Sequence, residues 1–200
     1  DSLLTHKDLK KRPRFSKKYV SFGKVENWKY KLLRKAFENY QAKKPEKLEF
    51  DFVDFLKEHD WWLQDYALFM AAKDHFKNEM WDEWEYGLKF RKKEAMEKYE
   101  SLLEEEIAFR KFVQFLFFRQ WFQLKKYANL KGVQIVGDLP LYVSGNSVDV
   151  WSNTDIFLLD KNLKPSKVGG VPPDYFSETG QLWGNPVFDW KRLEKRGFDW

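Results

Sequence analysis

Residues 169–186 combine tight-turn residues with side chains suited to holding a sugar. Sugar rings present apolar C–H faces and rims of hydroxyl groups, so their sites need flat aromatic surfaces beside carboxylates and amides. The segment supplies these groups in Asp174, Tyr175, Phe176, Gln181, Trp183 and Asn185. The residue types predict a carbohydrate-binding loop, although a rigid loop with a purely structural role fits the same composition.

A second candidate is Asp138, which follows a short run of mostly β-branched residues at 133–136. This run is bounded by glycines and predicts a buried strand. A long helical pattern precedes it, which is the order of one α/β unit of a parallel barrel. In such barrels an acidic residue just beyond a strand faces the active-site mouth. Alternatively, Asp138 is a turn carboxylate that accepts bonds from nearby backbone N–H groups.

The elements that must position these residues are mostly helices. Apolar residues at helical spacing predict helices over 27–42, which Pro45 ends, and over about 50–76. A third helix is expected to start near Ser101, with Glu104 completing a capping box, and to stop at Gly132. Its middle, 112–118, is apolar nearly all round, which predicts cover on several sides. Residues 137–190 are expected to form a long ordered loop region with short strands, one of them at 156–159.

The overall composition narrows the function classes. The 200 residues include no cysteine, which excludes disulfides and thiolate chemistry, and three scattered histidines do not predict a metal site. We therefore expect no metal and no cofactor. The mean hydropathy is −0.70, and no apolar run approaches the roughly 20 residues of a membrane-spanning helix. No secretory signal pattern opens the chain, so we expect a cytoplasmic protein without a membrane partner.

The positive charge is concentrated in residues 1–50, which hold fifteen Lys and Arg against six Asp and Glu. A basic arm at 7–18, with Phe15 and Tyr19 interleaved, is compatible with nucleic-acid binding. A solvated surface that faces an acidic neighbour explains the same residues. Because no nucleic-acid module signature accompanies the charge, we expect no nucleic-acid partner.

Five segments of the chain together resemble the signature segments of one known family. They are Gly137-Asp138-Leu139-Pro140-Leu141-Tyr142-Val143, Ser147-Val148-Asp149-Val150-Trp151, residues 170–186, and, in the helical part, residues 62–70 and 111–121. On these segments the chain is similar to the 4-α-glucanotransferases, also called amylomaltases or disproportionating enzymes. The segments cover almost the whole chain in the family's order. One departure is Gly145-Asn146, where family members often carry His-Asp or a similar acidic pair.

The resemblance implies an α/β fold that is part of a (β/α)₈ TIM barrel carrying a large α-helical insertion subdomain. Residues 1–100 would form the insertion, 101–143 a barrel helix and the following barrel strand, and 144–200 a long active-site loop region. It also implies a glycosyltransferase-type activity on α-1,4-glucans and maltooligosaccharides. Such enzymes hold the donor as a covalent glycosyl-enzyme and pass it to another glucan's hydroxyl, which is retaining double displacement.

The resemblance also assigns roles to individual residues. Asp138 matches a carboxylate that lines the donor subsite and is not the nucleophile. Residues 174–176 match a flexible loop over the cleft, while Gln181, Trp183 and Asn185 match its glucan-contacting base. The family's nucleophile and acid/base lie on later barrel strands, outside this sequence. Residues 73–76 share an Asp-His-Phe core with the nucleophile segment, but they continue a helical pattern. The isolated chain is therefore expected to be inactive, and a non-catalytic glucan-binding module is the alternative.

Overall fold

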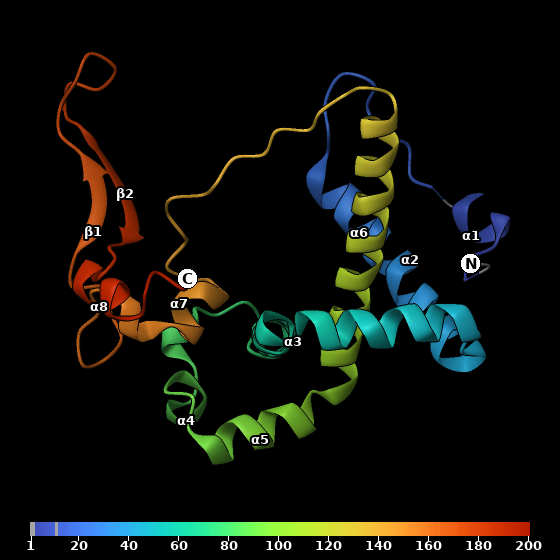
Figure 1. Ribbon diagram of the computed structural model, residues 1–200, viewed down its shortest axis with the longest axis horizontal. Coiled ribbons are helices and arrows are strands. Elements are labelled where there is room, and N and C mark those ends of the chain that lie inside the picture. The colour runs from blue at the N-terminus through green and yellow to red at the C-terminus, as the bar shows by residue number, and fades with distance from the viewer. Residues whose placement is uncertain (1–2, 11) are drawn as a thin grey trace. The chain divides into compact units, whose positions relative to one another are not determined.

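The structure, a computed structural model, describes residues 3–10 and 12–200 (Figure 1). The chain forms two compact units. The first unit consists of residues up to Ala67 together with Glu105–Gln134, and the second of Leu68–Glu104 together with Ile135–Trp200. Two long helices, α3 (Glu46–His75) and α6 (Glu104–Leu130), each cross a boundary between the units.

The first unit is helical, as the periodicity predicts. It contains α1 (His6–Lys10), α2 (Phe22–Lys43), most of α3 and nearly all of α6. The expected end of α2 is confirmed: Lys44 adopts the left-handed conformation and Pro45 follows, so that α3 begins at Glu46. Both helices begin earlier than predicted, at Phe22 and Glu46, whereas their ends lie within one residue of the predicted ends.

Aromatic rings from α2, α3 and α6 pack together in the core of the first unit. The Phe112 ring lies 4.8 Å from Tyr40 and 5.4 Å from Phe37, and Phe115 lies 5.1 Å from Phe52, measured between ring centroids. Burying one such side chain contributes about 1.5–3 kcal/mol. The high aromatic content of the chain is thus used, in this unit, to build a core.

The capping box expected at Ser101 is wrong. Ser101 lies inside α5 (Lys93–Leu102), and α6 begins only at Glu104, after Leu103 has closed α5 with a backbone bond to Tyr99. A serine inside a helix cannot serve as its N-cap. The predicted stop is confirmed, because Gly132 has a φ of 74°. The apolar middle of α6 is buried only in part: Phe112 and Phe115 are buried, whereas Phe117 is exposed.

The buried strand expected at 133–136 is also wrong. These residues form neither helix nor strand, and all four are exposed. A parallel strand takes its backbone hydrogen bonds from neighbouring strands, and no described residue pairs with this run. The described residues form helices and one two-stranded sheet, and a closed barrel is not seen among them.

The second unit combines short helices with a β-hairpin. Its elements are η1 (Trp81–Glu83), α4 (Tyr86–Lys89), α5, α7 (Val148–Ser152), η2 (Thr154–Ile156), β1 (Val168–Val171), β2 (Gln181–Pro186) and α8 (Trp190–Lys195). Its core is centred on Trp151, whose ring packs on Phe69 and Trp84 and whose indole N–H donates to the Leu88 carbonyl at 3.1 Å. The strand expected at 156–159 is reduced to isolated bridges, in which Phe157 pairs with Phe188 and Leu159 with Pro165.

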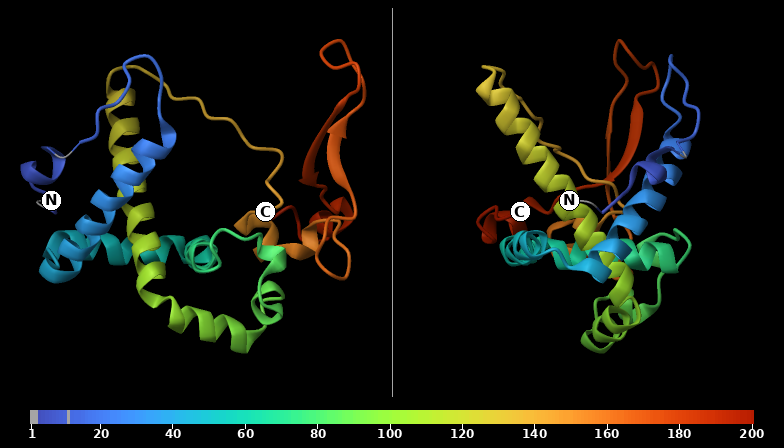
Figure 2. Two further views of the ribbon diagram at one scale, coloured as in Figure 1. Left: turned by 180° about the vertical axis from the view of Figure 1, so that it is seen from behind. Right: turned by 90° about the vertical axis from the view of Figure 1, so that its right-hand side faces the viewer.

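The segment 169–186, expected as a loop, is largely this antiparallel hairpin of β1 and β2. Val171 pairs with Gln181 and Gly170 with Leu182, with an irregularity before Gly170. In both views of the unit the strands run side by side and the tip lies at their far end from α8 (Figures 1 and 2). None of the helices within residues 3–10 and 12–200 combines the length and the apolar character of a membrane span.

Candidate functional site

The base of the hairpin brings two aromatic side chains together. Trp183 on β2 and Tyr142, which precedes α7 in the chain, have ring centroids 5.6 Å apart and planes inclined at 62°. Trp183 is 46% exposed, and Tyr142 is also exposed. The pair therefore presents an apolar surface to solvent, formed by β2 and the segment that precedes α7.

Two amides flank this aromatic pair and have different roles. The Gln181 Oε1 atom accepts a bond of 3.0 Å from the indole N–H of Trp183, which orients the ring. The Asn185 Nδ2 atom donates at 2.9 Å to the carbonyl oxygen of Val143. Asn185 thus ties β2 to the segment that follows Asp138, and its amide nitrogen is engaged by the protein's own backbone.

The hairpin tip is organised by Asp174. Its Oδ1 atom accepts bonds of 2.9 Å from the backbone N–H groups of both Phe176 and Ser177. This arrangement holds the two aromatic residues of the tip outward: Tyr175 is 97% exposed and Phe176 87% exposed. Their rings meet edge to face at 5.5 Å. At least one oxygen of the Asp174 carboxylate is therefore committed to the turn.

Asp138 lies in the exposed run that was expected to be a strand and its end. Among the described residues it forms no hydrogen bond or ion pair with the hairpin. The structure thus joins Gln181 to Trp183 on β2, ties Asn185 of the same strand to Val143, and places Tyr175 and Phe176 at the hairpin tip.

Two residues at this site were missed by the sequence reasoning. Tyr142 belongs to a segment that resembles the family, but nothing in the sequence pairs it with Trp183. Trp81 is buried and anchors the same segment: its indole N–H donates to Gly145 at 2.7 Å, and its backbone N–H to the Asn146 Oδ1 atom at 3.4 Å. Asn146, at the position of the departure from the family, thus acts as a local acceptor.

Residues 73–75 of the motif at 73–76 belong to the last turn of α3, as expected, and Phe76 begins the following turn. Asp74 and His75 lie in the last turn of α3 and are exposed, and the Lys73 ammonium donates to the backbone carbonyls of Asn78 and Glu79. No strand precedes them among the described residues. The described residues also contain no group of three or more His, Asp or Glu side chains arranged to hold a metal ion.

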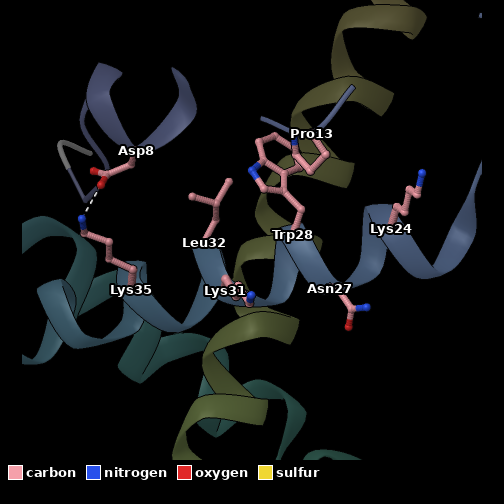
Figure 3. Close-up of a pocket in the computed structure, with 8 residues that line it drawn as sticks. All are labelled: Asp8, Pro13, Lys24, Asn27, Trp28, Lys31, Leu32 and Lys35. Atoms are coloured by element: carbon pink, nitrogen blue, oxygen red, sulfur yellow. Dashed lines mark hydrogen bonds and ion pairs between the residues drawn. The ribbon is translucent and has the colours of Figure 1, made fainter. Parts of the chain in front are cut away.

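A separate hollow in the first unit contains none of the predicted site residues (Figure 3). Trp28 and Leu32 of α2 form its apolar wall with Pro13, and lysines of the same helix surround it. The ammonium of Lys35 bonds to the carboxylate of Asp8 and holds its pKa well below the usual range. The ion pair links α1 to α2, so two of the residues around this hollow have a structural role.

Comparison with known proteins identifies the family. A family model described as 4-alpha-glucanotransferase matches residues 1–200. The chain belongs to the 4-α-glucanotransferase family. It is 49% identical over 200 residues to the 4-alpha-glucanotransferase of Aquifex aeolicus (strain VF5), covering 100% of this chain and 39% of that protein. It is also 49% identical to the Clostridium butyricum 4-alpha-glucanotransferase over 186 residues, 92% of this chain and 37% of that protein.

A solved member of the 4-α-glucanotransferase family has the same fold over this chain. The amylomaltase from Streptococcus agalactiae in complex with acarbose superimposes with a TM-score of 0.90 and 38% sequence identity, covering 99% of this chain and 40% of that one. The chain therefore spans about two fifths of the length of its relatives in the family.

Proposed function

We propose that this chain is a segment of a 4-α-glucanotransferase that moves α-1,4-glucan segments between maltooligosaccharides by retaining double displacement. The observation that carries the proposal is the family match along all 200 residues. The exposed Tyr142–Trp183 pair with its neighbouring amide supports it, because a flat aromatic surface beside a polar group suits a sugar ring.

The proposal includes the fold of the complete protein. We infer that residues 133–136 become a strand of a (β/α)₈ barrel when neighbouring strands supply hydrogen bonds, with residues 1–100 as the helical insertion and 144–200 as active-site loops. The exposed valines and isoleucine of the run, Val133, Ile135 and Val136, support this, because β-branched residues favour buried strands. The cytoplasmic location likewise remains a prediction.

Within this proposal the residues have separate roles. Trp183 and Gln181 contact the glucan, and Tyr175 and Phe176 cover it from the hairpin tip. Asp138 lines the donor subsite. Asn185 acts less by touching sugar than by holding the backbone at Val143, which follows Asp138. We assign no residue of this chain as nucleophile or acid/base. Excluding water from the closed site favours attack by a sugar hydroxyl over hydrolysis.

A chimera tests the proposal directly. The matching segment of the Aquifex aeolicus relative would be replaced by this chain, which aligns along its full length. Incubated with maltotriose, the chimera should form both longer and shorter maltooligosaccharides, with the unmodified relative as the positive control. A folded chimera that performs no exchange would contradict the proposal.

The isolated 200-residue chain provides the complementary measurement. It should release no new maltooligosaccharides from maltotriose, because the reacting carboxylates are not assigned to it. Clear disproportionation by the isolated chain would show that this assignment is wrong. Glucan binding by the chain, combined with an inactive folded chimera, would instead favour a non-catalytic glucan-binding module.

A further inference from the structure

An open hollow of about 440 Å³ lies in the second unit, and no residue of β1 or β2 lines it. Its size falls within the roughly 300–1,000 Å³ range of small-molecule sites. The lining comes from η1, α4 and the turn after η2, and consists of Asp82, Glu83, Trp84, Tyr86, Lys89, Phe90, Lys161 and Asn162. None of these residues has a role in the proposed transfer reaction.

An aromatic pair with an exposed tyrosine forms one part of this lining. Tyr86 begins α4, and Phe90 follows one helical turn later, so their side chains share a face of the helix. Their ring centroids are 4.6 Å apart with planes inclined at 36°, and Tyr86 is 67% exposed. Phe90 packs against the Tyr86 ring, and the Tyr86 ring remains open to solvent, as stacking on a sugar ring requires.

Two buried polar atoms of the lining residues lack partners. The Asp82 Oδ1 atom and the indole Nε1 atom of Trp84 have no hydrogen-bond partner among the described residues. Asp82 is only 7% exposed, and its other oxygen lies 2.7 Å from the Lys164 ammonium. Unpaired groups of this kind are rare in proteins. A hydroxyl group can donate to a carboxylate oxygen or accept from an indole N–H, so a ligand hydroxyl is suited to either atom.

The charge of the lining indicates which class of ligand fits. Two carboxylates, Asp82 and Glu83, stand beside two ammonium groups, Lys89 and Lys161. Sites that bind a polyanion such as a nucleic acid are predominantly basic. Both carboxylates of this lining would repel such a ligand. A neutral polyhydroxylated chain needs donors and acceptors of both kinds, and Asn162 adds an amide to them.

We propose that this hollow is a further α-glucan-binding site, with Tyr86 as its stacking platform and Asp82 and Trp84 as partners for sugar hydroxyl groups. The identity of the ligand rests on the proposed function. The site itself rests on the aromatic pair, the unpartnered atoms and the balanced charge. It would hold a glucan chain without taking part in the bond exchange.

Affinity electrophoresis of the 200-residue chain, in native gels with increasing amylose, tests this site. The measurement is made in a Trp183→Ala background, so that the hairpin does not dominate retardation. Amylose should retard this protein, and adding Tyr86→Ala should weaken the apparent affinity about fivefold, as loss of one stacked ring implies. Tyr86→Phe keeps the ring and should keep the affinity. Tyr127→Ala, which removes a tyrosine of similar exposure (62%) outside the hollow, is the matched control.

The possible outcomes separate this inference from the proposed function. No retardation in the Trp183→Ala background, no effect of Tyr86→Ala, or equal loss in Tyr127→Ala would each overturn the site. An active chimera together with any of these results would leave the proposed function standing. An inactive folded chimera would contradict that function, and retardation would still decide the site. Circular dichroism checks folding, and Tyr86→Leu, which keeps apolar bulk without a ring, replaces Tyr86→Ala if the latter unfolds.

Discussion

The indole N–H of Trp81 donates a hydrogen bond of 2.7 Å to the carbonyl oxygen of Gly145, 64 residues further along the chain. Trp81 belongs to η1 and Gly145 lies between Asp138 and α7, and both residues are part of the second unit. Together with the bond from Asn185 to Val143, this contact holds residues 143–145 from two different elements. Within the second unit, η1 and β2 thus help to position a segment that leads into the candidate site.

Replacing Trp81 with phenylalanine should destabilise the second unit. The variant loses the donor and leaves a part-buried carbonyl without its partner, which costs about 1–3 kcal/mol. Urea denaturation followed by circular dichroism measures the change. Trp61→Phe, at a strongly exposed position, is the control and should change stability little. Equal stability of the Trp81 variant and the parent chain would show that the bond contributes nothing.

Trp183→Ala in the chimera should reduce kcat/KM about tenfold with little change in Tm. The ring is half-exposed at the hairpin base, so few core contacts are lost, whereas a glucan would lose its aromatic surface. Initial rates with maltotriose and a thermal melt are both needed. A large fall in Tm with unchanged kinetics per folded molecule would assign Trp183 to the core instead.

Asp174 should act through the turn rather than through its charge. Asp174→Ala removes the acceptor of two backbone N–H bonds and should loosen the tip that presents Tyr175 and Phe176, which would raise KM in the chimera. Asp174→Asn keeps one side-chain carbonyl in that position and should retain most of the activity. If both variants lose activity equally, the carboxylate charge itself contacts the substrate.

The bond between Tyr99 and Glu85 should appear in the pH dependence of stability. Burial, helped by Glu85, raises the pKa of Tyr99 to about 12, and the Tyr99 hydroxyl in turn lowers the pKa of Glu85. A raised tyrosine pKa stabilises the fold below its ordinary value near 10, and that stability is lost as the pH rises through 12. A lowered glutamate pKa contributes stability above about 4.3, which is lost as the pH falls.

Tyr99→Phe should therefore lower Tm at neutral pH and flatten its decline between pH 10 and 12. Thermal melts across this range, with exposed Tyr127→Phe as the control, measure the difference in slope. Because Tyr40 and Tyr66 also have raised pKa values, only the difference between variant and parent isolates Tyr99. Identical slopes would contradict the assignment.

Local structure could be predicted from the sequence where it depends on neighbours in the chain, whereas prediction from the sequence did not reach contacts with remote residues. The apolar stripe of α2, the break at Pro45 and the left-handed stop at Gly132 follow from local periodicity and backbone preference. It failed at residues 133–136, because a strand depends on partners remote in sequence. It also failed at Ser101, where Leu103 interrupts the helix between serine and glutamate despite a matching pattern.

The candidate site was predicted in composition but not in arrangement. The aromatic and amide residues of the hairpin were identified, yet nothing in the sequence shows that Asn185 bonds to Val143 or that Tyr142 packs on Trp183. Those contacts span about 40 residues and depend on the pairing of β1 with β2. The strand β1 contains two adjacent glycines, which weakens any strand signal.

The two glycines Gly170 and Gly180 make the neck of the hairpin intolerant of change. A Cβ atom at Gly170 would lie 2.6 Å from the Gln181 carbonyl oxygen, and one at Gly180, where φ is 74°, would lie 2.5 Å from that of Val171. The tip beyond them has no such restriction, since Tyr175 and Phe176 extend into solvent. A library that keeps both glycines and randomises the two aromatic residues would therefore vary acceptor preference without changing the hairpin backbone. The tip can thus be engineered separately from the strands that carry it.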